Sequence, residues 1–227
     1  MYVNHHFLVD DVSVLHRIVD DARFGLLVSA GDPVTATHIP FVLHREPGEL
    51  GALIAHTPRA DGISRRFDGE TEMLVVFTGP VAYVSATWYE EPGLPTYNFV
   101  AVHAYGRPRA IDSRERALAH LRELVGIHEH ANGTAWSLDD APAGYVDALL
   151  PHIAPFELVI ERLEGKLKLS QNKSRNDRNG VMRGLRERGR DHDLAIAALM
   201  DDFAYASDEG SPILPDLSIP ASPYQPR

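Results

Sequence analysis

The chain has 227 residues, a mass of 25.1 kDa and a formal net charge of −10. Apolar residues make up 44% and charged residues 24%, the balance of a soluble globular protein, and a chain of this length buries roughly 70% of its unfolded surface. The absence of cysteine excludes disulfides, thiolate zinc sites, iron–sulfur clusters and a cysteine nucleophile. No apolar run is long enough to cross a membrane, and the first residues lack the pattern of a signal peptide, so we expect a cytoplasmic protein.

A basic window interrupts this acidic chain. Residues 162–190 carry ten Lys and Arg against three acidic residues, a local balance of +7 that leaves −17 elsewhere. Such a segment can face phosphate, a carboxylate-bearing ligand or nucleic acid, or it can be a solvated helix paired with acidic neighbours. Nucleic acid is the least favoured of these partners, because the chain is acidic overall and shows no helix-turn-helix pattern.

The first half of the sequence is mainly strand-like. Asp10-Asp11 cap a predicted helix that ends near Arg23. A turn or short helix is expected at residues 59–68, and the two prolines and one glycine of residues 88–95 predict a loop. Strands are predicted at residues 24–29, 33–43, 50–55 and 73–84, and at 96–111 with an interruption at Gly106-Arg107-Pro108.

The second half mixes helices with two closing strands. Ser113 opens the clearest helix, over residues 113–130, whose apolar stripe is Ala117, Leu118, Leu121, Leu124 and Val125. Strands early and helices late predict an α+β fold built on an antiparallel barrel. We assign residues 1–190 to the barrel domain with inserted helices, and 191–227 to a C-terminal helix and proline-rich tail. Further helices are predicted at residues 145–153, 178–188 and 193–204, and the closing strands at 156–160 and 166–169.

Twelve histidines invite a search for a metal site. His128 and His130 are two residues apart and point to different faces of a helix, which makes them solvated surface rather than ligands. His38, His56 and His103 lie in strand-like apolar segments, where an imidazole is either a buried hydrogen bonder or an iron ligand or general base. His56 is the candidate metal ligand, because the basic turn beginning at Arg59 could hold the acidic arms of a cofactor.

A phosphate-binding segment is predicted at residues 166–173. The chain has no G-x-G-x-x-G, Walker A or G-x-S-x-G motif, so a phosphate must be held by other groups. If the strand persists, Lys166, Lys168 and Ser170 share one face. The alternative is an exposed edge strand whose lysines oppose aggregation.

Several segments together resemble the PaiB-type "FMN-binding negative transcriptional regulator" family. The resemblance runs from Met1 to about Arg188 and is carried by residues 36–41 (ATHIPF), 79–85 (GPVAYVS), 95–107 (PTYNFVAVHAYGR), 163–172 (LEGKLKLSQN) and 177–181 (DRNGV). It implies an FMN-binding-type split antiparallel β-barrel with peripheral helices, and a homodimer with cofactor sites at the subunit interface.

Split barrels of this kind hold FMN or haem, and the resemblance extends to the haem-dependent piperazate synthases. The function we predict is therefore a haem b-dependent N–N bond-forming cyclase that acts on a small amino-acid-like substrate, N5-hydroxy-L-ornithine. His56 would be the axial ligand, with Arg59 and Lys168 near acidic groups and Tyr97 or His103 near the reacting centre.

Two alternatives stay open. The first is an FMN-binding oxidoreductase, with Trp88, Tyr83 and Tyr97 as the flavin platform and Lys166 and Ser170 at the phosphate. The second is a transcriptional regulator that binds DNA through the basic window.

Overall fold

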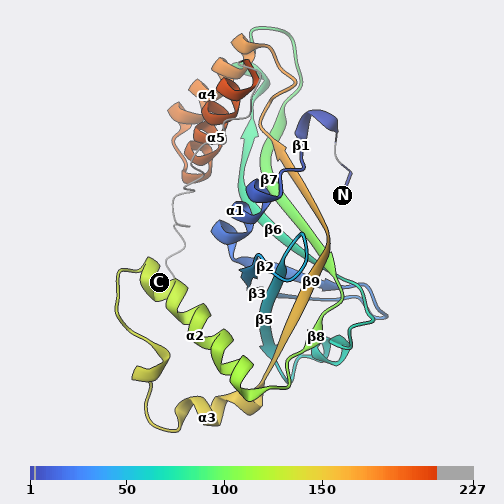
Figure 1. The fold of residues 1–227 in the computed structure, drawn as a ribbon. Coiled ribbons are helices and arrows are strands. Elements are labelled where there is room, and N and C mark those ends of the chain that lie inside the picture. The colour runs from blue at the N-terminus through green and yellow to red at the C-terminus, as the bar shows by residue number, and fades with distance from the viewer. Residues whose placement is uncertain (3, 209–227) are drawn as a thin grey trace. The chain divides into compact units, whose positions relative to one another are not determined.

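The computed structural model describes residues 1–2 and 4–208, with side chains as far as residue 202. The predicted proline-rich tail lies outside the described residues. None of the helices within these ranges combines the length and apolarity needed to cross a bilayer. The strands are β1 (Leu8–Val9), β2 (Phe24–Ser29), β3 (Thr35–Pro40), β4 (Val42–His44), β5 (Ala52–Pro58), β6 (Met73–Val84), β7 (Thr96–Gly106), β8 (Arg109–Ala110) and β9 (Ile153–Lys168). The α-helices are α1 (Val12–Ala22), α2 (Arg114–Ala131), α3 (Tyr145–Leu149), α4 (Arg175–Arg188) and α5 (Asp191–Asp208) (Figure 1).

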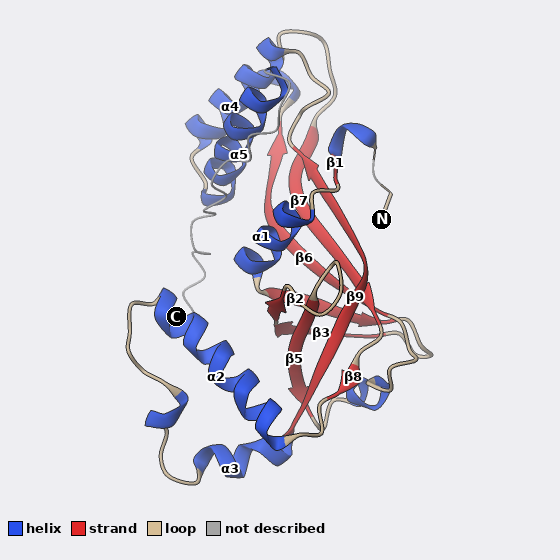
Figure 2. Cartoon of the chain, viewed as in Figure 1, coloured by secondary structure: helices blue, strands red, loops and turns tan. Residues whose placement is uncertain are grey.

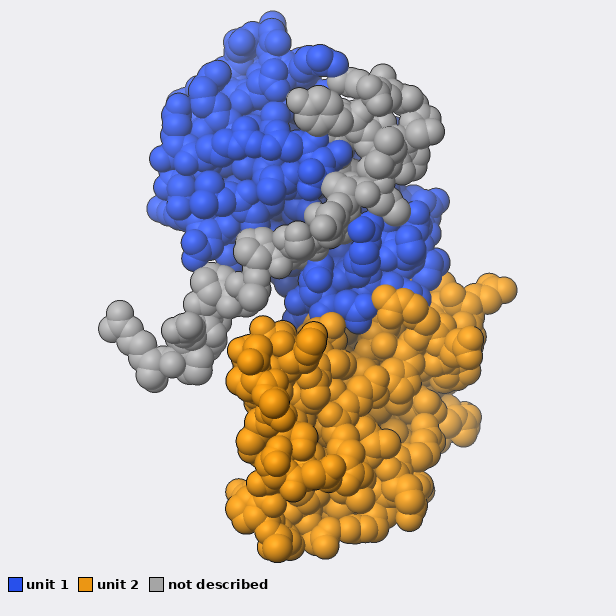
Figure 3. All heavy atoms as spheres, turned by 60° about the vertical axis from the view of Figure 1, so that its left-hand side comes forward, with its two compact units in different colours: residues 1–22, 78–102, 164–227 blue, residues 23–77, 103–163 orange. Residues whose placement is uncertain are grey.

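The chain divides into two compact units, each assembled from segments distant in the sequence (Figure 3). Unit 1 comprises Met1–Ala22, Thr78–Val102 and Glu164–Arg227, and unit 2 comprises Arg23–Phe77 and His103–Leu163. The strand order is β3-β2-β6-β7-β9-β5-β4, with β1 and β8 also pairing with β9. Strands β6, β7 and β9 contribute residues to both units.

In unit 2 the sheet curls. The sequence predicts a single strand over residues 33–43, but the structure divides it at Phe41 into β3 and β4, which stand at opposite ends of the strand order. The chain turns there because the Phe41 N–H donates to the Arg23 carbonyl (2.7 Å) and the Phe41 ring is buried edge-on against Phe77 and Phe156. Strands β3 and β4 follow each other in the chain but stand at the two ends of the strand order. The sheet must therefore bend back on itself, as the sheet of a barrel does.

In unit 1 helices α1 and α5 pack on the buried face of the strands. Leu15 of α1 lies so close to Gly165 of β9 that an added Cβ there would meet it at 2.1 Å. The Asn98 amide of β7 lies 3.4 Å from the Met200 sulfur of α5 on the same buried face. Helices α4 and α5 pack against each other, as Figure 2 shows. The alternate residues of these strands point to the opposite face, where Val81, Tyr83 and Tyr97 are exposed.

Strand β9 corrects the prediction of two closing strands. It runs unbroken through sixteen residues, including the charged stretch that the sequence suggested was a break. Within unit 2, Arg107 forms an ion pair with Glu161, and the Arg162 guanidinium lies 3.5 Å from the centre of the Tyr105 ring. Glu161 and Arg162 thus find partners on the exposed surface of β9, and a run of charged residues does not have to end a strand.

Candidate functional site

Two half-buried lysines lie beside four apolar or aromatic residues, three exposed and one half-buried, on one surface of unit 1, which we call the lysine–tyrosine face. Side chains two residues apart on a strand point the same way, and here the alternate residues are buried. Tyr83 and Tyr97 are 42% and 56% exposed, and their rings meet edge-on with centroids 5.5 Å apart. The members of the face are Val81 and Tyr83 of β6, Tyr97 and Phe99 of β7, and Lys166 and Lys168 of β9.

The lysines are held against this face by short contacts. The Lys168 ammonium donates to the Tyr97 carbonyl (2.9 Å) and to the Thr96 hydroxyl. The Lys166 ammonium donates to the Tyr2 carbonyl (3.2 Å) and lies 5.4 Å from the centre of the Phe99 ring. Burial lowers the pKa of Lys168, and the charges of Lys166 and Lys173 lower it further. Two neighbouring ammonium groups that repel each other are a favourable place for an anion.

Ser170 does not share the face with the lysines. The strand ends at Lys168, and Ser170 adopts a left-handed backbone conformation (φ 65°) that turns its side chain into the protein. The Ser170 hydroxyl is buried and accepts a hydrogen bond from the Asn98 amide (3.0 Å). The sequence predicts Ser170 on the shared face only if the strand persists, and the strand does not persist, because the turn that ends β9 at Lys168 breaks the two-residue period.

Trp88 packs against a helix. It ends the 3-10 turn Ala86–Trp88, and α4 presents two glycines to it. A Cβ at Gly184 would lie 2.4 Å from the indole, and a Cβ at Gly180 would lie 2.0 Å from the Trp88 carbonyl oxygen. The Arg188 guanidinium lies 5.0 Å from the centre of the same ring. The half-buried indole thus joins the turn to α4.

In unit 2, His56 pairs with a second histidine. The His56 Nδ1 on β5 lies 3.0 Å from the His120 Nε2 on α2, and the two rings are nearly perpendicular. Burial lowers the pKa of His56. Burial, together with the charges of His56 and His44, lowers the pKa of His120 to about 4. Both imidazoles are therefore neutral at pH 7.

The sequence analysis missed His120, although a signal was present. Position 120 lies three residues after Ala117 and four before Leu124, on the buried stripe of the helix, and its side chain is 3% exposed. The stripe predicted for this helix contains apolar residues alone, so it leaves out His120. A histidine in such a position needs a polar partner on the element that the helix covers.

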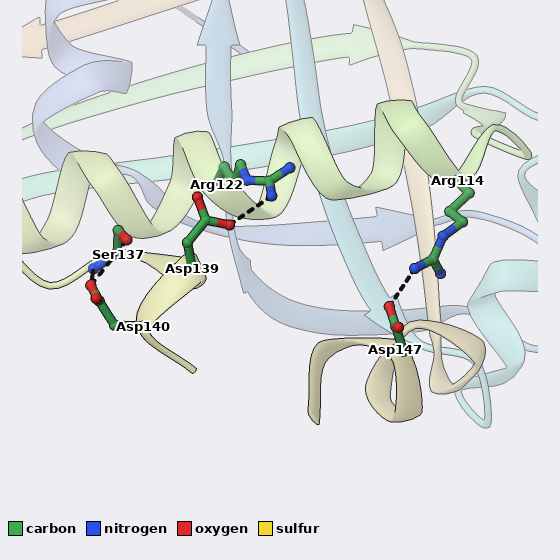
Figure 4. A network of polar contacts seen from close by, with 6 residues as sticks. All are labelled: Arg114, Arg122, Ser137, Asp139, Asp140 and Asp147. Carbon is green, nitrogen blue, oxygen red and sulfur yellow. Dashed lines mark hydrogen bonds and ion pairs between the residues drawn. The ribbon is translucent and has the colours of Figure 1, made fainter. Parts of the chain in front are cut away.

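Polar pairs hold α2 and the segment after it in place. Helix α2 meets the sheet of unit 2 through His44 with Glu123 (2.8 Å) and Arg116 with Glu157 (3.0 Å). Figure 4 shows how the following segment is tied back to α2. Arg114 binds Asp147, Arg122 binds Asp139 (2.7 Å), and the Ser137 N–H donates to Asp140 (2.8 Å). These contacts fix the position from which His120 reaches His56.

The two remaining predicted site residues lie in unit 2. The Arg59 guanidinium donates to the carbonyls of Pro151 (3.0 Å) and Ile153 (2.7 Å), where the chain enters β9. His103 is half-buried on β7, with its Nδ1 3.4 Å from the Tyr105 hydroxyl. Among the described residues, no three His, Asp or Glu side chains lie close enough together to hold a metal ion. Of the predicted site residues, the structure brings Tyr97, Lys166 and Lys168 together in one face.

Comparison with protein families identifies the chain. The model of the family described as "Putative FMN-binding domain" matches residues 1–162, which is most of the sequence. The chain belongs to this family. The chain is similar to the Bacillus subtilis "Protease synthase and sporulation protein PAI 2", which is 28% identical over 205 residues. The alignment covers 89% of this chain and 97% of the relative, and it confirms the PaiB-type resemblance. An uncharacterized protein of Emericella nidulans is 30% identical over 92% of this chain and the whole of the relative.

Solved structures confirm the fold class of this family member. The flavocytochrome Anf3 of Azotobacter vinelandii superposes with a TM-score of 0.55 at 14% identity, over 73% of this chain and 72% of that one. A FAD and haem binding protein of Mycobacterium smegmatis superposes with a TM-score of 0.52 at 14% identity, over 71% of this chain and 73% of the other. The predicted α+β split barrel is therefore correct.

Proposed function

We propose that this protein binds FMN on the lysine–tyrosine face and uses it in a redox reaction on a small molecule. The observation that carries the proposal is the composition of that face, with two ammonium groups beside two exposed tyrosine rings on adjacent strands. Membership of the "Putative FMN-binding domain" family supports it. When bound, FMN supplies hydride or electron transfer.

The residues present fit the two ends of FMN. Each ammonium has three N–H donors, and the contacts described use one on Lys166 and two on Lys168, so both can still donate to a phosphate. Tyr83, Tyr97 and Phe99 offer apolar ring surface on which a flat isoalloxazine can stack. The prediction that Ser170 binds the phosphate is not part of this proposal, because its hydroxyl is already bonded inside the protein.

We expect a second copy of the chain to complete the site. A flavin lying on an exposed face buries only one side of its ring, whereas small-molecule sites bury most of the ligand. The uncovered part of the face, with Tyr97 at 56% exposure, is the apolar surface that a homodimer would bury. The substitution Tyr97→Glu places a charge there, and we expect it to convert a dimer to a monomer in sedimentation velocity. A variant that sediments as the wild-type dimer contradicts this interface.

The phosphate contacts can be tested by titration. We expect Lys166→Gln and Lys168→Gln each to weaken FMN binding about tenfold, or about 1.4 kcal/mol, because each removes a charged donor to the phosphate. Quenching of flavin fluorescence measures the affinity. The control is Arg183→Gln, which removes the same charge from the exposed side of α4 in the same unit and should change the affinity less than twofold. If all three substitutions weakened FMN binding equally, the affinity would depend on the net charge of the protein and not on contacts from Lys166 and Lys168 to the phosphate.

A second candidate function is the haem-dependent cyclase, which would join the two nitrogens of N5-hydroxy-L-ornithine with loss of water. His56 favours it, as a half-buried imidazole that is neutral at pH 7 and whose Nε2 has no partner in the described part of the chain. Two proteins of similar fold are named for binding haem as well as flavin. A Soret band that appears on adding haem and is lost in His56→Ala would support this candidate. The matched family is described as FMN-binding and not as haem-binding, and we therefore rank this candidate below FMN.

A further inference from the structure

The contact between His56 and His120 allows two arrangements of protons. Their nitrogens are 3.0 Å apart, so a single proton lies between them. A neutral imidazole carries one proton, and the nitrogen that donates fixes the other as an acceptor. Either His120 donates from Nε2 and His56 keeps its own proton on Nε2, or His56 donates from Nδ1 and His120 keeps its proton on Nδ1.

The buried nitrogen of His120 distinguishes these arrangements. The His120 Nδ1 is inaccessible to solvent and has no hydrogen-bond partner within the described residues. If His56 donated, this position would hold a buried N–H without an acceptor, the kind of group that is rarest in folded proteins. If His120 donates, the position holds only a lone pair. That arrangement also leaves both rings protonated on Nε2, the form that a neutral histidine favours in water.

We infer that His120 is a positioning residue that donates to His56 Nδ1 and so holds the His56 proton on Nε2. His56 then presents an N–H donor rather than a lone pair. Such a group suits a ligand with a carbonyl or carboxylate oxygen and is unsuited to iron, since a histidine that binds a metal must direct a lone pair at it and usually donates its other N–H to an acceptor. The residues around His56 therefore do not fit haem. The inference does not depend on the FMN proposal, because all of its residues lie in unit 2 and the lysine–tyrosine face lies in unit 1.

The surrounding contacts keep His120 from turning away. Ala117 and Leu124 are buried on either side of it along α2. One turn further along the helix, Glu123 binds His44 of β4, and Arg116 on the preceding turn binds Glu157 of β9. Helix α2 is thus attached to three strands of the sheet, which fixes the distance between the two imidazoles.

Nitrogen NMR of the cofactor-free full-length protein at pH 7.5 tests the inference directly. Long-range ¹⁵N–¹H correlation distinguishes a protonated from an unprotonated ring nitrogen, and the His56 signals are assigned as those missing from His56→Gln. We expect protonated Nε2 and unprotonated Nδ1 at His56. A protonated Nδ1 at His56 would overturn the inference, whatever the outcome of any FMN experiment.

A substitution that reverses the hydrogen bond supplies an independent readout. Glutamate at position 120 can only accept when ionised, so His120→Glu should move the His56 proton to Nδ1 and free Nε2 as a ligand. We expect this variant to bind ferric haem at least tenfold more tightly than the wild type, followed by the Soret band, and His120→Phe, which removes the partner, to fall between the two. A wild type that binds haem through His56 as tightly as His120→Glu would also overturn the inference. If neither variant folds, as judged by circular dichroism, the NMR measurement on the wild type decides alone.

Discussion

Acidification from pH 7 to pH 4 is expected to remove about 3 kcal/mol of unfolding free energy through His120 alone. The pKa of this residue falls from 6.5 in the unfolded chain to about 4 in the folded protein, because the imidazole is buried beside His56 and His44. A lowered pKa means that the unfolded state binds the proton first as the pH drops. The contribution is therefore complete above pH 6.5, is lost between pH 6.5 and pH 4, and stays lost below that range.

Urea unfolding of the cofactor-free protein at a series of pH values measures this loss. Other groups also titrate in this range, so the informative quantity is the difference in pH slope between the wild type and His120→Gln, which has no imidazole at this position. We expect the variant to lose the steep part of the curve between pH 6.5 and pH 4. Parallel curves for the two proteins would show that His120 is not buried as described.

Adding one methyl group at Gly180 is expected to destabilise the protein by about 2–3 kcal/mol. Replacing glycine by alanine inside a helix normally stabilises it by about 1 kcal/mol. At Gly180 the new Cβ would lie 2.0 Å from the Trp88 carbonyl oxygen, and a backbone atom cannot swing aside as a side chain can. The helix would have to move away from the turn, which is the cost of overpacking.

The matched control is Gly126→Ala on α2. Gly126 is also a glycine inside a helix, but an added Cβ there meets nothing within 4 Å. We expect this substitution to stabilise the protein by about 0.5–1 kcal/mol in the same urea experiment. We therefore expect the free energy of unfolding to fall in Gly180→Ala and to rise in Gly126→Ala. Stabilisation by Gly180→Ala would mean that α4 does not rest on Trp88.

Residue patterns predicted the parts of the site that depend on local geometry. The two-residue period of a strand predicts that Lys166 and Lys168 point to the same side, and both lie in β9 with the buried Leu167 between them. The period does not predict that Tyr97 of β7 lies beside them. It does not reach Ser170, because the end of β9 is set by a left-handed turn and by a hydrogen bond to Asn98, which is distant in the sequence. His120 escaped prediction for a related reason, since its partner His56 comes from another part of the chain.

The surroundings of Trp88 also depend on residues distant in the sequence. The sequence offers Trp88, with Tyr83 and Tyr97, as a candidate for a flavin platform. The glycines that receive it, Gly180 and Gly184, lie far along the chain on α4, and their four-residue spacing places both on one side of that helix. Such spacing could have been noticed in the sequence, but nothing local connects it to Trp88.

The absorption spectrum of the cofactor-free protein, titrated in parallel with FMN and with ferric haem, shows which of the two cofactors the chain binds. We expect a perturbed flavin spectrum that saturates at one FMN per chain, with weaker binding in the Lys166→Gln/Lys168→Gln double variant, and no histidine-ligated Soret band. Saturable haem binding that depends on His56, together with no response to FMN, would contradict the proposal that this protein binds FMN.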